Sequence, residues 1–291
     1  MNLEQPLVSI CIPSYNAELF IQETIQSVLN SAYNNLEIIV SDDNSIDQTQ
    51  KIVENVKDDR IYLYINDKKM GVPGNWNQAI EKSKGEIICF LNHDDLIGPH
   101  WLEYAADKLI KYPHVQWVSS NFLEINTTGE VFQYVRKFKE NRIYEPSEIF
   151  RVLMRQNGLG PGFIIRRNVL EKIGLFDETM GPAADNDLFI RFSIKYPMFF
   201  STTPHTYRRT HSRNLSLQWP RSDQARVGYQ ILEKTFSQAH LPTKMKKMKN
   251  EAYLYFNYKT TLALLSLCKQ GNWDVLREIL EIQKNRGIDF S

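Results

Sequence analysis

Residues 86–95, EIICFLNHDD, place two adjacent carboxylates, Asp94 and Asp95, directly after an apolar run. The run at residues 86–91 is rich in β-branched and apolar residues, as expected for a strand buried on both faces of a sheet. Two neighbouring carboxylates repel each other unless a cation or hydrogen-bond donors compensate them. The stretch therefore predicts a buried strand that ends in a polar site.

The first hundred residues repeat this pattern with helical segments between the strands. Similar apolar runs occupy residues 8–12, 36–40 and 61–65. Segments with apolar side chains at helical spacing occupy residues 19–32, 45–56 and 73–85, the last with Pro73 in its first turn and Gly85 as its C-terminal cap. This alternation predicts a parallel α/β sheet with right-handed crossovers. Because ligands of such sheets bind beyond the carboxyl ends of the strands, the polar residues after each strand should meet at one edge.

The composition excludes several classes of protein. With 291 residues, 42% of them hydrophobic, the chain can bury a large core. Its 35 Lys and Arg balance 34 Asp and Glu, so we expect no nucleic-acid partner. Three cysteines, two of them in strand-like runs, favour a reducing, cytoplasmic compartment. We expect no cleaved signal, because the N-terminus lacks a basic region followed by a long apolar stretch, and no membrane span, because no stretch of about 18 apolar residues occurs.

The pattern loosens after residue 100. Strands or a hairpin are predicted at residues 115–125 and 131–138, helices at 146–154 and 184–196, and a glycine-rich turn, strand and helix at 158–174. From about residue 222 the chain is predicted to be largely helical. We therefore divide it into a catalytic domain, residues 1–221, and a helical C-terminal appendage, residues 222–291.

Polar groups follow each of the first four predicted strands. The segments are PSYN (13–16), SDDNS (41–45), NDKKMG (66–71) and NHDD (92–95). Tyr15 can stack on a base, Asp43 can accept a hydrogen bond from a ring nitrogen, and Asp94 or Asp95 can hold a hard divalent cation. Each segment alone also suits a turn or a helix cap. Their shared position at successive strand ends favours a site for a nucleotide and a metal.

Longer blocks of the sequence resemble a known family. They cover residues 8–49, 75–103, 160–178 (GPGFIIRRNVLEKIGLFDE) and 184–192 (ADNDLFIRF). In this order, and across about residues 7–216, they resemble the inverting family 2 glycosyltransferases with the GT-A fold. The resemblance implies a Rossmann-like, mostly parallel sheet flanked by helices. It also implies a nucleotide-sugar donor and a single displacement that inverts the anomeric centre.

The resemblance assigns residues to the donor site. Pro13, Tyr15 and Asn16 match the first nucleotide-contacting block, in which Tyr15 would stack on the base. Asp43 matches the carboxylate that bonds the pyrimidine ring. Asn77 lies in the segment that matches a helix near the donor.

The resemblance also assigns a metal site. Asp95 is our preferred metal ligand and Asp94 would contact the ribose or sugar, while Asn92 replaces the usual first acidic residue. His211 falls in an arginine-histidine block that commonly supplies another ligand. One imidazole nitrogen among oxygen ligands makes Mn²⁺ at least as suitable as Mg²⁺. Arg208 could contact the diphosphate, since guanidinium matches phosphate oxygens.

A second acidic pair lies at Asp185 and Asp187. The resemblance makes Asp185 the general base that deprotonates the acceptor hydroxyl, although Ala184 stands where a glutamate usually precedes it. Asp187 is the alternative base, or a first-turn residue stabilised by the helix dipole. Glycines at residues 158–162 could let backbone approach the sugar or acceptor, or form an ordinary turn.

The C-terminal stretch contains lysines that could bring the protein to a membrane surface near a lipid-linked acceptor. The lysines of KMKKMKN, residues 244–250, could contact anionic lipid headgroups or form a solvated helix face. The apolar residues 252–267 should pack on the catalytic domain or against another subunit. The sequence therefore leaves the oligomeric state open.

The sequence thus predicts a metal-dependent glycosyltransferase that moves a sugar, most simply from UDP, to a hydroxyl of a glycan or lipid-linked acceptor in surface polysaccharide synthesis. It would act in the cytoplasm, at the inner face of the membrane. One alternative is a nucleotide-sugar-binding protein without turnover. Another is a sugar-phosphate nucleotidyltransferase, which should carry a glycine-rich basic loop after the first strand, where PSYNAELF (13–20) has none.

Overall fold

The computed structural model describes residues 5–155, 158–269 and 273–284. Its strands join one mixed sheet in the order β3-β2-β1-β4-β9-β6-β10-β5, with β7 beside β6 and β8 beside β10. The strands are β1 (Val8–Ser14), β2 (Leu36–Asp42), β3 (Ile61–Ile65), β4 (Ile87–Phe90), β5 (Leu96–Ile97), β6 (Trp117–Ile125), β7 (Val131–Val135), β8 (Arg142–Tyr144), β9 (Phe163–Arg166) and β10 (Met198–Arg209).

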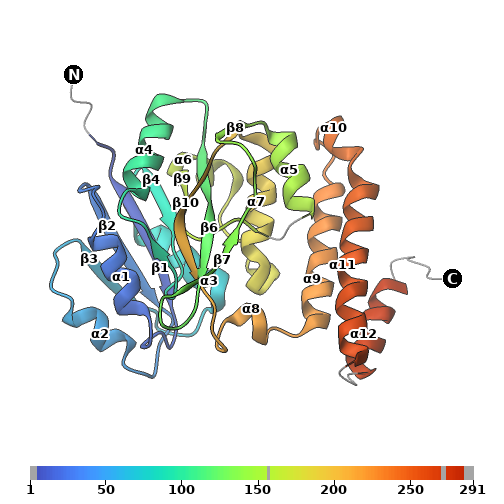
Figure 1. The fold of residues 1–291 in the computed structure, drawn as a ribbon, viewed down its shortest axis with the longest axis horizontal. Coiled ribbons are helices and arrows are strands. Elements are labelled where there is room, and N and C mark those ends of the chain that lie inside the picture. Colours follow the sequence, from blue (N-terminus) through green and yellow to red (C-terminus); the bar gives the residue numbers. More distant parts are fainter. Residues whose placement is uncertain (1–4, 156–157, 270–272, 285–291) are drawn as a thin grey trace.

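Helices cover both faces of this sheet (Figure 1). They are α1 (Ile21–Leu29), α2 (Thr49–Asn55), α3 (Gly71–Lys82), α4 (Trp101–Lys111), α5 (Pro146–Arg155), α6 (Arg167–Ile173), the 3₁₀ helix η1 (Glu178–Ala183), α7 (Ala184–Lys195), α8 (Leu215–Gln218), α9 (Arg221–Phe236), α10 (Thr243–Lys246), α11 (Lys249–Lys269) and α12 (Trp273–Lys284).

The predicted parallel half of the sheet is present. β1 pairs in parallel with β2 and β4, and β2 pairs in parallel with β3, so all four carboxyl ends lie at one edge. β9 runs antiparallel between β4 and β6, and β10 is parallel to β6. Strand β10 therefore also ends at this edge. Its antiparallel pairing with β5 brings Tyr207 beside Leu96, just after the acidic turn.

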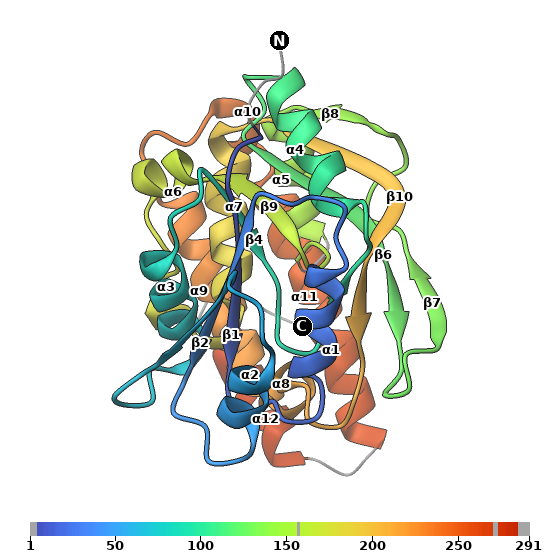
Figure 2. The ribbon, with the colours of Figure 1, turned by 90° about the vertical axis from the view of Figure 1, so that its left-hand side faces the viewer.

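Successive side chains of each strand point to opposite faces of the sheet, and each face has its own core cluster. Ile10 and Ile12 belong to a cluster with residues of α1 and α4, whereas Cys11 and Phe90 belong to a second cluster with residues of α3 and α7. Figure 2 shows α1, α2 and α4 in front of the strands, and α9 and α11 behind them. The site edge is thus held between two packed layers.

The described chain from residue 221 onward is largely helical, as predicted. In Figure 1, α9, α11 and α12 form an outer layer beyond α5 and α7. Met245 and Met248 are buried in the second core cluster, while the lysines around them are exposed. Along α11, Leu254, Tyr258 and Leu262 face solvent. Within the described ranges, none of the helices combines the length and the apolar character that a membrane crossing demands.

Gly85 is not the C-terminal cap of α3, contrary to our prediction. The helix ends at Lys82 with Ser83 as its cap. A Cβ atom at Gly85 would lie 2.6 Å from the carbonyl oxygen of Leu7, so glycine is needed for close packing against the start of β1.

Candidate active site

The acidic turn after β4 is joined to the chain after β10. The Asp94 Oδ2 atom lies 2.9 Å from Nε2 of His211 and accepts a hydrogen bond of 3.0 Å from the side-chain amide of Asn214. The Asn214 side chain also accepts the main-chain N–H of His211 at 2.6 Å. Burial acts to raise the pKa of Asp94, but the His211 hydrogen bond and the nearby His93 bring it below its ordinary value.

Asp95 has different partners from its neighbour. Its carboxylate accepts a 2.8 Å hydrogen bond from the Asn92 side chain and a 2.9 Å bond from the main-chain N–H of Arg209. Burial, and then the charge of Asp94, raise the pKa of Asp95 to about 8. Both carboxylate oxygens are therefore engaged by the protein's own donors.

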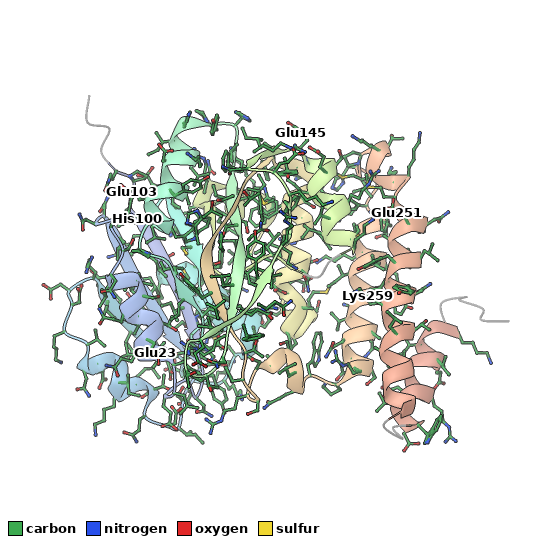
Figure 3. The ribbon with its side chains drawn as sticks, viewed as in Figure 1. Glu23, His100, Glu103, Glu145, Glu251 and Lys259 are labelled. Carbon is green, nitrogen blue, oxygen red and sulfur yellow. The ribbon has the colours of Figure 1, made fainter. Side chains whose placement is uncertain are left out.

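The Arg209 side chain holds the acidic turn in place. Its buried guanidinium donates to the Asp94 carbonyl at 3.0 Å and pairs with Glu23 on α1 at 2.7 Å. Its remaining contacts include the carbonyls of Asn126 and Thr127 and the face of the Phe20 ring. Figure 3 labels Glu23 on α1. These contacts tie β10 and α1 to the acidic turn.

Asp43 shapes the loop that follows β3. It is buried and accepts the main-chain N–H groups of Met70 and Gly71 at 2.7 and 2.9 Å, together with the Asn66 side chain at 3.1 Å. Two of these donors belong to the beginning of α3, where main-chain N–H groups lack helical partners. Asp43 therefore fixes the entry to α3.

Tyr15 lies at the open edge, beside the loop that Asp43 holds. Its ring is 36% exposed, and the Lys69 ammonium lies 3.7 Å from the ring centre. Asn16 adopts a left-handed conformation with φ of 48°, and its side chain accepts the main-chain N–H of Ile46. The Pro13 carbonyl contacts the His93 ring at 3.2 Å. Of these residues, Tyr15 presents the flat exposed surface that a base requires.

Asp185 lies in the first turn of α7, close to Gly158. A Cβ atom at Gly158 would lie 3.9 Å from Oδ2 of Asp185, and the Asp185 carboxylate accepts the main-chain N–H of Asn186 at 2.7 Å. Burial raises the pKa of Asp185 to about 6, against the opposing effects of that hydrogen bond and of Lys137. This value suits a carboxylate that accepts a proton near neutrality.

A family model described as glycosyl transferase family 2 matches residues 9–174. The chain belongs to glycosyl transferase family 2. The resemblance read from the sequence is therefore confirmed.

Solved structures and curated proteins resemble this family 2 chain over different lengths. TarS of S. aureus, residues 1–349, in complex with UDP matches with a TM-score of 0.71 and 21% identity, over 96% of this chain and 81% of that chain. The mannosyltransferase PcManGT of Pyrobaculum calidifontis, in complex with GDP-Man and Mn²⁺, matches with a TM-score of 0.64 and 20% identity, over 99% and 77%. The shared GT-A fold confirms the predicted fold class.

A curated relative in Escherichia coli is the UDP-Glc:alpha-D-GlcNAc-diphosphoundecaprenol beta-1,3-glucosyltransferase WfgD. It is 36% identical over 133 residues, which are 46% of this chain and 52% of that protein. The chain spans between 43% and 66% of the length of the first curated relatives that it matches, glycosyltransferases of Rickettsia species.

Other residues assigned to the site in this family 2 chain have partners within the protein. The Asn77 side chain exchanges two 3.0 Å hydrogen bonds with the main chain of Phe176. Asp187 is buried between Arg191 and Lys234, each 2.8 Å away, which accounts for it without a catalytic role. Arg208 is half exposed, pairs with Glu124 and lies over the Phe122 ring.

Two residues near these carboxylates were not predicted. Asn214 stands three positions after His211, in the same polar block, and that spacing was the available signal. Lys137 follows β7, in a stretch predicted to be a strand. Burial, and then Arg208, lower the pKa of Lys137 to about 8, while Glu124 and Asp185 raise it. Asp185 and Arg208 lie far from Lys137 in the sequence, so no local pattern pointed to Lys137.

The donor set at the acidic turn fits a divalent cation only if a ligand contributes further atoms. Among the described residues, no cluster of three or more His, Cys, Asp or Glu side chains could hold a metal ion. Asp94 and His211 supply one carboxylate and one imidazole at adjacent positions. This pair suits a cation that keeps its remaining positions for phosphate oxygens.

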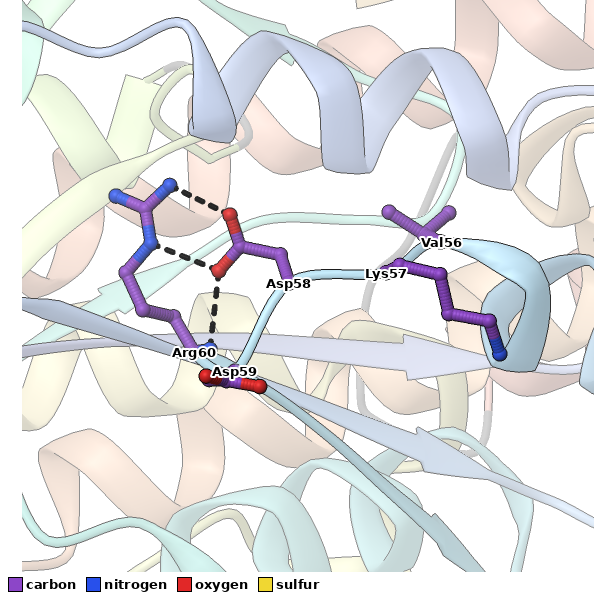
Figure 4. A pocket seen from close by; sticks show the side chains of 5 residues that line it. All are labelled: Val56, Lys57, Asp58, Asp59 and Arg60. Atoms are coloured by element: carbon purple, nitrogen blue, oxygen red, sulfur yellow. Dashed lines mark hydrogen bonds and ion pairs between the residues drawn. The ribbon is translucent and has the colours of Figure 1, made fainter.

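A surface recess of about 600 Å³ lies elsewhere, and Val56, Lys57, Asp58, Asp59 and Arg60 line it (Figure 4). Asp58 and Arg60 form a two-point ion pair there. The recess precedes β3, at the opposite end of that strand from the site edge. It is therefore separate from the candidate active site.

Proposed function

We propose that the chain transfers a sugar from a nucleoside diphosphate to an acceptor hydroxyl, with inversion at the anomeric carbon. The observation that carries this proposal is the pairing of Asp94 with His211 and Asn214 at the carboxyl edge of the sheet, within a chain of glycosyl transferase family 2. A diphosphate–metal unit fits this pair, and the carboxylate of Asp185, in the first turn of α7, supplies a base.

For the donor we propose a UDP-sugar. Support comes from the UDP-Glc named for the E. coli relative and from the UDP complex of TarS. The base would stack on Tyr15 after displacing Lys69 from the ring, and the released ammonium could pair with a phosphate. Arg208 is a second cation within reach of the diphosphate in this proposal.

For the metal we propose Mn²⁺ or Mg²⁺ held by Asp94 and His211. The hydrogen bonds that occupy both oxygens of Asp95 lead us to replace Asp95 by Asp94 as the carboxylate ligand. Asp95 then acts through Arg209 by fixing the turn. When bound, the cation neutralises charge that develops on the departing nucleoside diphosphate.

The protein's own groups then perform a single displacement. Asp185 accepts the proton of the acceptor hydroxyl as the hydroxyl oxygen attacks the anomeric carbon. The bond between that carbon and the phosphate oxygen breaks on the opposite face, and its electron pair leaves with the nucleoside diphosphate. Because the hydroxyl oxygen attacks on one face of the anomeric carbon and the diphosphate leaves from the other, the configuration of that carbon is inverted.

For the acceptor we propose a lipid-linked glycan at the inner face of the cytoplasmic membrane, in surface polysaccharide synthesis. The diphosphoundecaprenol acceptor named for the E. coli relative supports this choice. The exposed lysines at 244, 246, 247 and 249 could contact anionic headgroups, at about 1 kcal/mol per residue near such a surface. Buried free thiols at Cys11 and Cys89 agree with a reducing compartment.

Thermal shifts test the donor and the metal together. UDP, GDP, dTDP and CDP are compared with and without Mn²⁺ on the wild type, Asp94→Ala and Asp107→Ala, the last a matched change at an exposed carboxylate. A ligand at a hundredfold excess over its dissociation constant stabilises the fold by about 2.7 kcal/mol. We expect one Mn²⁺-dependent shift, lost in Asp94→Ala and kept in Asp107→Ala.

The other outcomes of this panel are equally definite. A shift that survives in Asp94→Ala but disappears in Asp95→Ala returns the metal ligand to Asp95. The absence of a shift with all four nucleotides refutes the proposed function. Asp185→Asn then separates an enzyme from a binding protein, because an enzyme loses sugar transfer while it keeps the nucleotide shift.

A further inference from the structure

Several large apolar side chains are exposed at the edge of the sheet that carries the candidate active site. Leu19 follows β1 and is 53% exposed, and Ile46 follows β2 and is 87% exposed. Leu215 and Leu217 belong to α8, which follows β10, and they are 44% and 58% exposed. Because β1, β2 and β10 all end at this edge, the three segments lie around it. We call these four side chains the apolar rim.

The loops that carry Leu19 and Ile46 are fixed by contacts with each other and with the site. The main-chain N–H of Ile46 donates to the Asn16 side chain at 3.1 Å, which joins the loop after β2 to the loop after β1. Next to Leu19, the Phe20 ring lies 4.8 Å from the His211 ring, measured between ring centres. The exposure of these two rim residues is therefore built into the fold.

The helix α8 is fixed at both of its ends. Asn214, its N-terminal cap, donates a hydrogen bond to the Asp94 carboxylate at 3.0 Å. Trp219, its C-terminal cap, packs partly buried against the second core cluster. Leu215 and Leu217 lie between these two anchors and remain exposed. Exposed apolar surface of this kind marks an interaction site when several such side chains gather in one place.

The charge of the α8 segment indicates which partner fits the rim. Residues 212–221, SRNLSLQWPR, contain Arg213 and Arg221, both exposed, and no Asp or Glu. Leucine and arginine side chains together suit the interface of a bilayer with anionic lipid, where apolar groups enter the headgroup region and cations meet phosphate. A second copy of the chain on the rim would instead cover the edge at which donor and acceptor must enter. These observations favour a lipid surface.

The rim and the lysines around α10 lie at opposite ends of the molecule. In both views α8 is at the lower end, whereas α10 is at the upper end (Figure 1 and Figure 2). A flat membrane that contacts the rim therefore does not contact the α10 lysines.

We propose that the apolar rim is a membrane-contacting surface, which sets the candidate active site against a bilayer that contains anionic phospholipid. This inference rests on the lipid-linked acceptor of the proposed function, and it assigns the membrane contact to the rim in place of the α10 lysines. The rim side chains enter the headgroup region, and Arg213 and Arg221 meet the lipid phosphates. The acceptor then reaches Asp185 while its lipid stays in the bilayer.

Vesicle co-sedimentation tests this surface without turnover. The vesicles contain phosphatidylcholine, with or without phosphatidylglycerol. The wild type should bind both and should bind the anionic vesicles more tightly. Ile46→Ser/Leu217→Ser should weaken binding by about tenfold or more, because two apolar side chains no longer leave water. The matched control is Leu254→Ser/Tyr258→Ser, at exposed apolar positions of α11, and it should bind as the wild type does.

A second pair of changes separates the rim from α10. Lys244→Glu/Lys247→Glu reverses two exposed charges at α10 and should leave vesicle binding unchanged. Binding that is lost in this variant and kept in Ile46→Ser/Leu217→Ser overturns the proposal. Sedimentation velocity tests the competing protein partner. A wild-type dimer that becomes a monomer in Ile46→Ser/Leu217→Ser, without vesicle binding, also overturns it.

Nucleotide thermal shifts separate this inference from the proposed function. Ile46→Ser/Leu217→Ser should keep the unfolding midpoint and the Mn²⁺-dependent nucleotide shift of the wild type, because Tyr15, Asp94 and His211 are unchanged. A chain that binds vesicles through the rim but shows no nucleotide shift refutes the proposed function and leaves the membrane surface in place. A chain that shows the nucleotide shift but does not sediment with vesicles overturns the membrane surface alone.

Discussion

At the scale of single residues, Asp94 and Asp95 coexist because each has its own donors. His211 and Asn214 compensate Asp94, while Asn92 and the main chain of Arg209 occupy Asp95. In our proposal, Asp94 is the metal ligand and Asp95 fixes the turn. Asp185 differs from both, because burial raises its pKa to about 6. Raised pKa values of this kind are common at functional sites.

Asp185→Asn should stabilise the fold at neutral pH. The pKa of Asp185 rises from an ordinary 3.8 to about 6 in the folded chain, so the unfolded chain loses this proton first as the pH rises. The free energy of unfolding therefore falls between about pH 4 and about pH 6 and stays lower above that range. Asparagine is neutral throughout. We expect a higher unfolding midpoint for the variant at about pH 7.5 and equal midpoints at about pH 4, measured by circular dichroism.

The same pH series on Asp107→Ala provides the control, because that carboxylate is exposed. If Asp185→Asn is no more stable than the wild type at about pH 7.5, burial does not penalise the Asp185 charge. The assignment of Asp185 as a base tuned by burial would then be wrong.

At the scale of elements, local pattern predicted the first half of the sheet but not its contacts. Strands were predicted at residues 8–12 and 86–91, and the structure has them at Val8–Ser14 and Ile87–Phe90, buried along their whole length. The two-residue strand Leu96–Ile97 lacks any such run, and it exists because β10 pairs with it. For the same reason, the sequence could place His211 near the acidic turn only through a family resemblance. Which of the two aspartates it contacts depends on how β10 ends.

The Asn77 side chain connects two elements that are distant in the sequence. Its side chain both donates to and accepts from the main chain of Phe176, which joins α3 to the segment before η1. Asn77→Ala should lower the free energy of urea unfolding by about 1–3 kcal/mol, because two hydrogen bonds are lost. The neighbouring Gln78→Ala should change it little, since Gln78 bonds only weakly to Glu81, at 3.4 Å. A raised KM for the donor in Asn77→Ala, with unchanged stability, would instead indicate direct contact with the donor.

At the scale of the whole molecule, the outer helices share their core with the sheet. Tyr229, Leu232 and Met248 belong to the same buried cluster as Phe90. Lys234 on α9 bridges Asp177 and Asp187, at 2.6 and 2.8 Å, and Arg155 on α5 pairs with Glu251 on α11. We therefore propose that α9 and α11 unfold together with the sheet.

Phe256→Ala tests this proposal. The Phe256 ring packs edge-on against Tyr229, with centres 4.8 Å apart, and occupies the space where a side chain at Gly228 would lie. Its removal should cost roughly 3 kcal/mol. Far-ultraviolet dichroism and tryptophan fluorescence should still report one shared, lowered transition. Leu254→Ala, at a position 73% exposed on the same helix, should leave the transition unmoved. Two separate transitions would show that the helices unfold independently.

The pairing of Asp94 with His211 also sets an order of events during synthesis. The two residues are 117 positions apart, and translation proceeds at about 5–20 residues per second, so roughly 6–23 s pass between their additions. For nearly all of that interval the nascent chain carries both carboxylates without Arg209, His211 or Asn214. The first half of the sheet can form on the ribosome, but its acidic turn is completed only after β10 has emerged. A ribosome that stalls before residue 209 would thus display a sheet edge whose negative charges still lack their partners.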